Sequence, residues 1–376
     1  MRRVICFFSV VLVLGLLMPL SAHGEGYACG ACAVGVQGDG RVLAGQQGDI
    51  LQSAAGLSKL PAILTLCRAF DQGIIQGETV MSVSQRAAGI PGPTAFLEAG
   101  ESIQAEALWK AAVMISAGDA ICTLGENAFG SESVFCQNIE VTCRELGVEK
   151  EFSDCVGTGI KFTAEELLKL GLAAAESPGF CRWAGVYMDE IVHENGRSTE
   201  LVSANRMLRS YSGCFGLLTG SSSEDGYCGV FAAKKNDTVA VAVVLGARSS
   251  QKRFDIAGEL LEYVYANYRM VTMHRAGETV EEVPVEKGEG KTVCLISQET
   301  AAFLCPKDGG IPEKVLEAEL PLQAPLRADT PVGAVSYRLE GEVLCTLPLY
   351  PDRDVGEYTF LSLLRRFMKG YTGAAA

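Results

Sequence analysis

Apolar and polar positions along the chain follow two periods, and the changes between them predict a series of elements. Short apolar runs on either side of the turn residues 37–40 (QGDG) predict a hairpin over 34–43. From Leu57 to Phe70 the apolar residues recur at helical spacing. A buried helix is therefore expected to begin near Gly56.

Helical spacing dominates the middle of the chain. It predicts helices over Ala105–Ile115, Asp119–Ala128, Glu132–Leu146 and Ala164–Ala175. The residues 163–166 (TAEE) form a capping box at the start of the last of these. We therefore expect a helical block at the centre of the first domain.

Strand patterns return after this block. Within 226–247 the runs YCGVFAA and TVAVAVVLGA flank the turn residues 234–237, and 255–268 returns to helical spacing. The polar stretch 249–252 (SSQK) between them is interpreted as a solvated loop. Because strands come from both ends of the region 25–268, we predict an α+β domain whose sheet is interrupted by the helical block.

The remaining chain divides into a β-rich part and a short tail. Four β-type runs with turn residues between them (VEEVPVE, KTVCLIS, GAVSYRL and EVLCTLPL) predict a small all-β domain over 271–357. In the tail, 358–376, six apolar residues lie on one helical face and four polar or basic residues on the other: Phe360, Leu361, Leu364, Phe367, Met368 and Tyr371 against Ser362, Arg365, Arg366 and Lys369. Residues 358–371 make a helix of about 21 Å, which suits the surface of an anionic membrane, with docking on the β-domain as the alternative.

The first 24 residues have the pattern of a secretory signal peptide. Arg2 and Arg3 precede an apolar run from Val4 to Leu20, and small residues at 22 and 24 follow it. An uncleaved membrane anchor is the alternative, since 17 apolar residues are marginal for crossing a bilayer. We expect cleavage after Gly24 and a location outside the cytoplasm, at the outer face of the cytoplasmic membrane, in the periplasm or in the cell wall.

Composition excludes several kinds of function. The 45 acidic and 32 basic residues give a net charge of −13, which argues against nucleic acid as a partner. After cleavage only His193 and His274 remain, so a multi-histidine metal site is excluded and a histidine-based triad would need one of them. We expect neither a metal nor another cofactor.

Thirteen cysteines remain after cleavage, and their state is open. An exported chain can form disulfides, but an odd number leaves at least one thiol over. Many lie in apolar contexts and suit buried free thiols equally well. Cys29 and Cys32 form a lone C-x-x-C, which is weak support for zinc or redox chemistry.

Several strings, together with this layout, resemble one family. They are AVGVQGDGRVLAG, FLEAGESIQAEALWKAAVMISAGDA, GSESVFCQNIEVTCRELG, ANRMLRSYSGCFGLLTGSSSEDGYCGVFAA and LQAPLRADTPVGAV, and the cationic tail adds to them. From about Ala33 onward the chain resembles the D-alanyl-D-alanine carboxypeptidases among the low-molecular-mass penicillin-binding proteins. These serine peptidases trim peptidoglycan stem peptides. The resemblance implies a penicillin-binding-protein/β-lactamase-like domain followed by the small all-β domain.

The resemblance also implies where catalysis should occur, and the first motif departs from it. The family carries S-x-x-K at the start of a buried helix, where serine is the nucleophile and lysine takes its proton. Aligning Lys59 on that lysine places Gly56 where the serine belongs. Three other residues fit poorly as substitutes: Ser58 lies about 100° around the helix, Ser53 lies upstream of it, and Cys67 is two turns further along.

The other two motifs each keep part of the pattern. The S-x-N position reads Ser116-Ala-Gly118, so its serine is retained and its amide is lost. The K-T-G position reads Leu218-Thr219-Gly220, so the substrate-binding threonine and glycine are retained and the lysine is lost. Every motif therefore lacks a side chain that performs chemistry in the family.

The sequence thus predicts an exported carboxypeptidase homologue of peptidoglycan metabolism that is catalytically defective. It would either bind stem peptides that end in D-Ala-D-Ala or act as a scaffold for an active penicillin-binding protein. A working serine-type carboxypeptidase with an unrecognised nucleophile is the alternative.

Overall fold

The computed structural model describes residues 26–358, and its internal contacts divide these residues into two compact units after Asn267. The predicted signal peptide and nearly all of the predicted amphipathic tail lie outside the described residues. None of the helices in the described part of the chain combines the length and the apolarity that crossing a bilayer requires.

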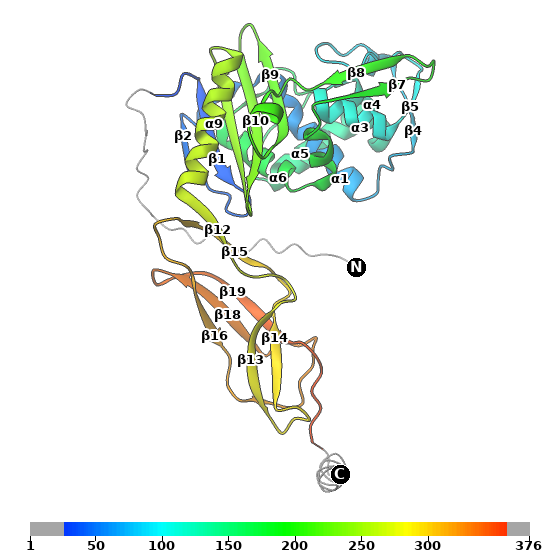
Figure 1. The fold of residues 1–376 in the computed structure, drawn as a ribbon. Coiled ribbons are helices and arrows are strands. Elements are labelled where there is room, and N and C mark those ends of the chain that lie inside the picture. The colour runs from blue at the N-terminus through cyan, green and yellow to red at the C-terminus, as the bar shows by residue number, and fades with distance from the viewer. Residues whose placement is uncertain (1–25, 359–376) are drawn as a thin grey trace. The chain divides into compact units, whose positions relative to one another are not determined.

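The first unit is built on a five-stranded antiparallel sheet (Figure 1). Its strand order is β2-β1-β11-β10-β9, with bounds Ala44–Gln46, Ala31–Val36, Thr238–Ala247, Gly226–Lys235 and Cys214–Ser222. The two N-terminal strands pair with strands that follow the helical block, since Ala31 lies opposite Leu245. The predicted sheet with strands from both ends of the domain is confirmed.

The N-terminal hairpin forms, but its second strand is displaced from the prediction. β2 begins at Ala44, which pairs with Val34, so residues 41–43 belong to the loop rather than to a strand. The turn is wider than expected because both Gly38 and Gly40 have positive φ, at 83° and 73°. The exposed Arg41 pairs with Asp39 across this loop.

Helices fill the part of the first unit between β2 and β9. The predicted helix near Gly56 begins as a 3₁₀ turn, η1 (Ala55–Lys59), and continues as α1 (Leu60–Asp71). The predicted helical block is confirmed, and two of its helices have the predicted bounds. The remaining helices are α2 (Gln85–Ala88), α3 (Ala105–Ile115), α4 (Gly118–Phe129), α5 (Glu132–Glu145), α6 (Ala164–Ala175), α7 (Pro178–Ala184) and α8 (Met207–Ser210).

Helices α6 and α9 (Ser250–Asn267) cover opposite faces of the sheet (Figure 1). On α6, Gly171 lets the helix approach Val230 and Val241 closely, because an added Cβ would meet their methyl groups at 2.8 and 3.0 Å. On the other face, the ring of Phe254 packs against Phe231, with centroids 5.6 Å apart.

Helix α9 corrects the interpretation of residues 249–252 as a loop. The helix begins at Ser250 rather than at 255, and the Ser249 hydroxyl accepts a hydrogen bond from the Lys252 N–H at 3.1 Å. A serine in that role satisfies an otherwise unpaired donor of the first turn. The polar residues that suggested a loop lie on the solvent side of this turn, whereas Arg253 is buried.

Three short antiparallel strand pairs complete the first unit. They are β3 with β6 (Gln52–Ser53, Lys161–Phe162), β4 with β5 (Val80–Ser82, Ser102–Gln104), and the hairpin β7 with β8 (Met188–Val192, Ser198–Val202). The sequence pattern did not predict them.

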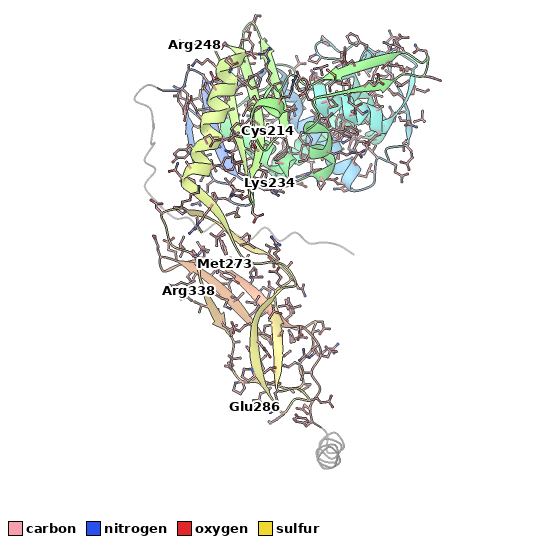
Figure 2. All side chains as sticks on the ribbon, viewed as in Figure 1. Cys214, Lys234, Arg248, Met273, Glu286 and Arg338 are labelled. Carbon is pink, nitrogen blue, oxygen red and sulfur yellow. The ribbon has the colours of Figure 1, made fainter. Side chains whose placement is uncertain are left out.

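The second unit contains strands and no helix among its described residues, as the predicted all-β domain requires. A six-stranded sheet has the order β16-β18-β19-β14-β13-β17, and β12 pairs with β15. Its core includes Val335, Tyr337 and Leu349. Figure 2 labels Glu286 on β13 and Arg338 on β18. The strands are β12 (Tyr268–His274), β13 (Thr279–Glu286), β14 (Thr292–Ile296), β15 (Ala301–Pro306), β16 (Glu313–Glu317), β17 (Leu322–Gln323), β18 (Gly333–Leu339) and β19 (Glu342–Pro351).

Candidate functional site

Lys59 is a buried cation at the end of η1. Its side chain is 6% exposed, and Nζ donates a hydrogen bond to the Ser116 carbonyl oxygen at 2.8 Å. Burial lowers the pKa of Lys59 to about 8, although the negative charge of Asp119 partly opposes this shift. An amine with a pKa close to neutrality can accept a proton, which a solvent-exposed lysine cannot do readily.

The segment 116–118 brings two predicted site residues to this amine. Ser116 ends α3 in a left-handed conformation, with φ at 54°, and the chain turns there into α4. An added Cβ at Gly118 would lie 3.5 Å from Lys59 Nζ but only 2.6 Å from Ile90 Cγ2. Position 118 therefore faces the lysine, and a larger residue there requires the Ile90 side chain to move.

Strand β9 approaches the same place from the sheet. A Cβ added at Gly56 would lie 3.5 Å from Gly220 Cα and 3.8 Å from the Thr219 carbonyl oxygen, which are ordinary contacts. A Cβ at Gly220 would instead meet the Gly56 nitrogen at 2.5 Å, so a side chain at 220 is excluded. Leu218 is 2% exposed and belongs to the hydrophobic core of the first unit.

The structure thus assembles residues that are far apart in sequence. Gly56, Lys59, Ser116 and Gly118 lie together, and Thr219 and Gly220 lie beside them on β9. These strand residues are toward the end of the sheet that carries Arg248, opposite the end that carries Lys234 (Figure 2).

A cavity of about 290 Å³ opens beside Gly56 and Lys59. Besides these two residues, Ser53 and Ser58 from the segment 53–59, Asp225, and the loop residues 91–93 and 156–160 line it. The Ser58 hydroxyl donates to the Val156 carbonyl oxygen at 2.8 Å, which ties it to the cavity wall. Cys67 is buried elsewhere, with Sγ 2.7 Å from Ser177 Oγ.

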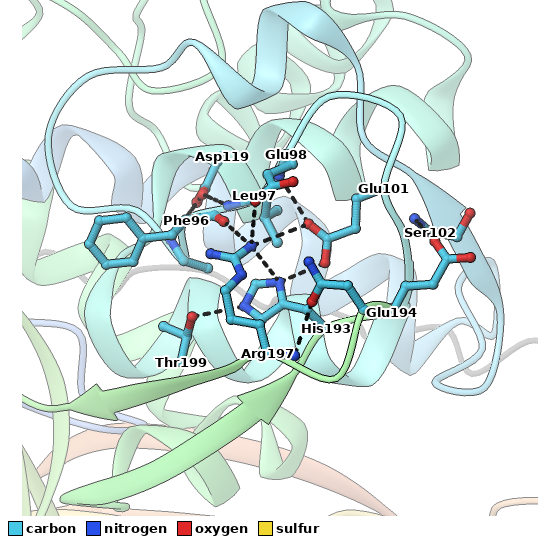
Figure 3. Close-up of polar contacts among 12 residues, drawn as sticks. Phe96, Leu97, Glu98, Glu101, Ser102, Asp119, His193, Glu194, Arg197 and Thr199 are labelled. Atoms are coloured by element: carbon cyan, nitrogen blue, oxygen red, sulfur yellow. Dashed lines mark hydrogen bonds and ion pairs between the residues drawn. The ribbon is translucent and has the colours of Figure 1, made fainter.

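Asp119 fixes the loop that forms one wall of this cavity. Its buried carboxylate accepts hydrogen bonds from the Ala95 N–H at 2.9 Å and the Leu97 N–H at 3.1 Å. Arg197, from the β7–β8 hairpin, donates to the Phe96 carbonyl oxygen at 2.8 Å (Figure 3). The loop is therefore held by α4 and by the hairpin.

His193 takes part in this support, as Figure 3 shows. Its Nδ1 donates to Glu101 Oε1 at 2.6 Å, and its Nε2 lies 2.8 Å from Thr199 Oγ1. The arrangement has the partners of a triad, but the His193 side chain is completely buried and cannot meet a substrate. His274 lies in the second unit, 2.6 Å from the Tyr337 hydroxyl. Neither histidine reaches Lys59's cavity in the described structure.

Arg253 is a buried cation beside β9 that sequence reasoning missed. Its Nη1 donates to the carbonyl oxygens of Gly220 at 3.1 Å and Cys228 at 2.9 Å, and burial lowers its pKa to about 10. It was missed because residues 249–252 were interpreted as a loop, so the predicted helix began only at 255. The helical spacing predicted for 255–268, extended one turn back, would have placed Arg253 against the sheet.

Comparison with known sequences decides the family. Residues 28–249 match the D-alanyl-D-alanine carboxypeptidase family, and residues 268–357 match the C-terminal domain of penicillin-binding protein 5. The chain belongs to the D-alanyl-D-alanine carboxypeptidase family. It is 26% identical over 339 residues to D-alanyl-D-alanine carboxypeptidase DacF of Bacillus subtilis, covering 89% of this chain and 87% of that protein. It is 24% identical to DacC of Escherichia coli, covering 88% and 84%.

Solved structures show the same fold. Penicillin-binding protein 5 of Haemophilus influenzae superposes with a TM-score of 0.71 at 20% identity, covering 89% of this chain and 99% of that one. Penicillin-binding protein 3 of Streptococcus pneumoniae, described as a peptidoglycan synthesis regulatory factor, gives 0.68 at 18% identity, covering 88% and 100%. These similarities confirm the predicted penicillin-binding-protein fold with its C-terminal β-domain. As a carboxypeptidase-family chain, it is a D-Ala-D-Ala carboxypeptidase-like protein of peptidoglycan metabolism.

Proposed function

We propose that this protein is an exported, catalytically defective carboxypeptidase homologue that binds peptidoglycan stem peptides. The observation that carries the proposal is Gly56, which occupies the expected nucleophile position at a cavity that also receives Lys59. The added Cβ there would make only ordinary contacts, so the local geometry accommodates a side chain that the sequence does not supply.

The chemistry of acyl transfer supports the defect. Loss of the serine in a serine hydrolase costs on the order of a millionfold in kcat. Lys59 has the lowered pKa of a proton acceptor, but its hydrogen bond goes to the Ser116 carbonyl oxygen, which has no proton to give. Leu218 replaces the expected cation with a buried apolar side chain.

Peptide binding is supported by groups that survive around β9. This strand is at the edge of the sheet, where unpaired main-chain groups can pair with an extended peptide. The half-buried Thr219 offers a hydroxyl, and Arg253 supplies positive charge next to Gly220. A terminal D-alanine carboxylate needs a donor such as the Thr219 hydroxyl and is favoured by nearby positive charge, because a buried unpaired anion is costly.

The proposal includes a location, which is supported by the sequence patterns of residues 1–24 and 358–371. Cleavage after Gly24 would release the protein outside the cytoplasm, where the carboxypeptidases of the family act on the cell wall. Residues 358–371 would then hold it at the membrane surface through their apolar face, with Arg365 and Arg366 facing anionic lipid.

Calorimetry with a pentapeptide ending in D-Ala-D-Ala tests the binding function. We expect heat of binding at up to millimolar peptide, its loss in Thr219→Arg, and its retention in the matched variant Thr279→Arg, which changes an exposed threonine of the second unit. A peptide ending in L-Ala-L-Ala should bind more weakly. Absence of heat with the folded wild-type protein would contradict stem-peptide binding and favour the scaffold function with an active penicillin-binding protein.

A further inference from the structure

Two buried cysteines meet behind the wall of the cavity. Cys122 lies on α4, one turn beyond Gly118, and Cys155 lies in the segment that follows α5. Both side chains are fully buried, and their sulfur atoms lie within 4.8 Å of each other and of a carboxylate oxygen of Glu132. Cys155 is hydrogen bonded to Cys122. The two thiols are thus neighbours in the protein interior.

The carboxylate of Glu132 is already occupied. Arg86 donates to its two oxygens at 3.0 and 3.1 Å, and the Cys155 N–H donates to Oε1 at 3.1 Å. A metal ion would have to displace Arg86 to gain Glu132 as its third ligand, and structural zinc generally takes four. The cluster therefore favours a bond between the two sulfur atoms over a metal site.

We propose that Cys122 and Cys155 form a disulfide in the exported protein. The inference rests on the export that the proposed function includes, because disulfides persist in oxidising compartments. The oxidant is a low-molecular-mass disulfide or a disulfide-carrying exchange protein. One cysteine thiolate attacks it, forms a mixed disulfide and releases one thiol. The second cysteine thiolate then attacks the mixed disulfide, forms the Cys122–Cys155 bond and releases the other thiol, so two cysteine protons and two electrons leave with the reduced oxidant.

Burial sets when this reaction can occur. The hydrogen bond with Cys122 and desolvation both raise the pKa of the Cys155 thiol, and the charge of Glu132 adds to the rise. The thiolate that performs exchange is therefore scarce in the folded protein. The bond consequently forms while the chain folds, before Cys155 is buried, and the folded reduced protein is slow to oxidise.

The bond would fix one wall of the cavity. Val156 and Gly157, which line the cavity, directly follow Cys155, and the Val156 carbonyl oxygen accepts the Ser58 hydroxyl. Cys122 lies on the helix that begins at Gly118. A link between them ties the segment 154–160 to α4 and keeps it beside Lys59.

Oxidative refolding of the mature chain tests the proposal. The protein is unfolded in guanidinium chloride, refolded with reduced and oxidised glutathione, alkylated with iodoacetamide and mapped by mass spectrometry without reduction. We expect a linked peptide pair that contains Cys122 and Cys155. It should be lost in Cys122→Ser and in Cys155→Ser but kept in Cys143→Ser, a matched buried cysteine of α5. Folding is checked by circular dichroism.

A second readout keeps the test decisive if a variant folds poorly. In the wild-type protein, amide exchange across 154–160 should be slower after oxidative refolding than after refolding with excess reductant. Alkylation of both cysteines in the refolded wild-type protein would overturn the proposal. So would zinc bound at equal stoichiometry in native mass spectra and lost in Cys122→Ser. Neither result would alter the calorimetric test of stem-peptide binding, so the two proposals fail separately.

Discussion

Lys59 carries a charge in a place that disfavours it, and this has a measurable effect on stability. Its pKa falls from the ordinary 10.5 to about 8 on folding. Below about pH 8 the folded protein holds a destabilised cation. Between about pH 8 and 10.5 the folded form has lost a proton that the unfolded form still binds, so the free energy of unfolding rises with pH.

The variant Lys59→Met should lack this rise. We expect the wild-type protein to gain about 3 kcal/mol in unfolding free energy relative to Lys59→Met between pH 7 and pH 10.5, measured by urea denaturation. Lys161→Met, which changes an exposed lysine, should keep the wild-type slope. If the unfolding free energy of Lys59→Met rose with pH as steeply as that of the wild-type protein, the amine would not be held in the buried state described.

Three substitutions restore the side chains that the motifs lack. We expect the combined variant Gly56→Ser, Gly118→Asn and Leu218→Lys to become labelled by fluorescent penicillin on a denaturing gel. The serine fits without a clash, whereas the asparagine requires the Ile90 side chain to move. Omitting Gly56→Ser should abolish the label, because it supplies the nucleophile. If the folded triple variant were not labelled by fluorescent penicillin, that result would count against the alignment of the motifs.

At the scale of elements, Asp119 joins α4 to the loop that lines the cavity. Asp119→Asn replaces one acceptor oxygen by an amide donor that faces the Ala95 and Leu97 N–H groups. We expect faster amide exchange at residues 95–97 and a loss of about 1–3 kcal/mol in unfolding free energy. Glu126→Gln, which changes a half-buried acid on the same helix, is the matched control. Unchanged exchange at 95–97 would mean that the hairpin alone holds the loop.

The elements that sequence predicted well are those whose signals are local. α3 and α6 match their predicted bounds because an apolar stripe runs their full length, and the Thr163–Glu166 capping box defines the start of α6. The pairs β3–β6 and β4–β5 were missed because two or three residues carry no period, and pairing with distant residues forms them. Arg253 was missed for a different reason, since the polar residues 249–252 were interpreted as a loop and the helical spacing of 255–268 was not extended back to it.

The site shows the same division between local and distant information. The proximity of Gly56, Lys59 and Ser116 followed from the family resemblance, because no local pattern joins residues nearly sixty positions apart. The loops 91–93 and 156–160 line the cavity but have neither period nor motif, so sequence reasoning did not include them. The sequence likewise did not show that Leu218 packs into the hydrophobic core, because its neighbours there are brought together only by the fold.

At the scale of the molecule, each of the two units has its own hydrophobic core. We expect calorimetry of the mature chain to show two thermal transitions. Leu349→Ala removes a fully buried side chain of the second core, which costs about 2–5 kcal/mol in unfolding free energy. It should therefore lower the midpoint temperature of one transition. Leu170→Ala, on α6, should lower the other. A single transition that both variants shift would show that the units unfold together.

The most direct test of the account is penicillin acylation of the purified wild-type chain. Fluorescent penicillin reports the formation of a covalent acyl-enzyme, which requires a nucleophile beside Lys59. We predict no labelled band and no added mass on the intact protein, under conditions that label an active carboxypeptidase of the family. A covalent adduct on the folded chain, mapped to a residue of the cavity such as Ser53 or Ser58, would contradict the proposed catalytic defect.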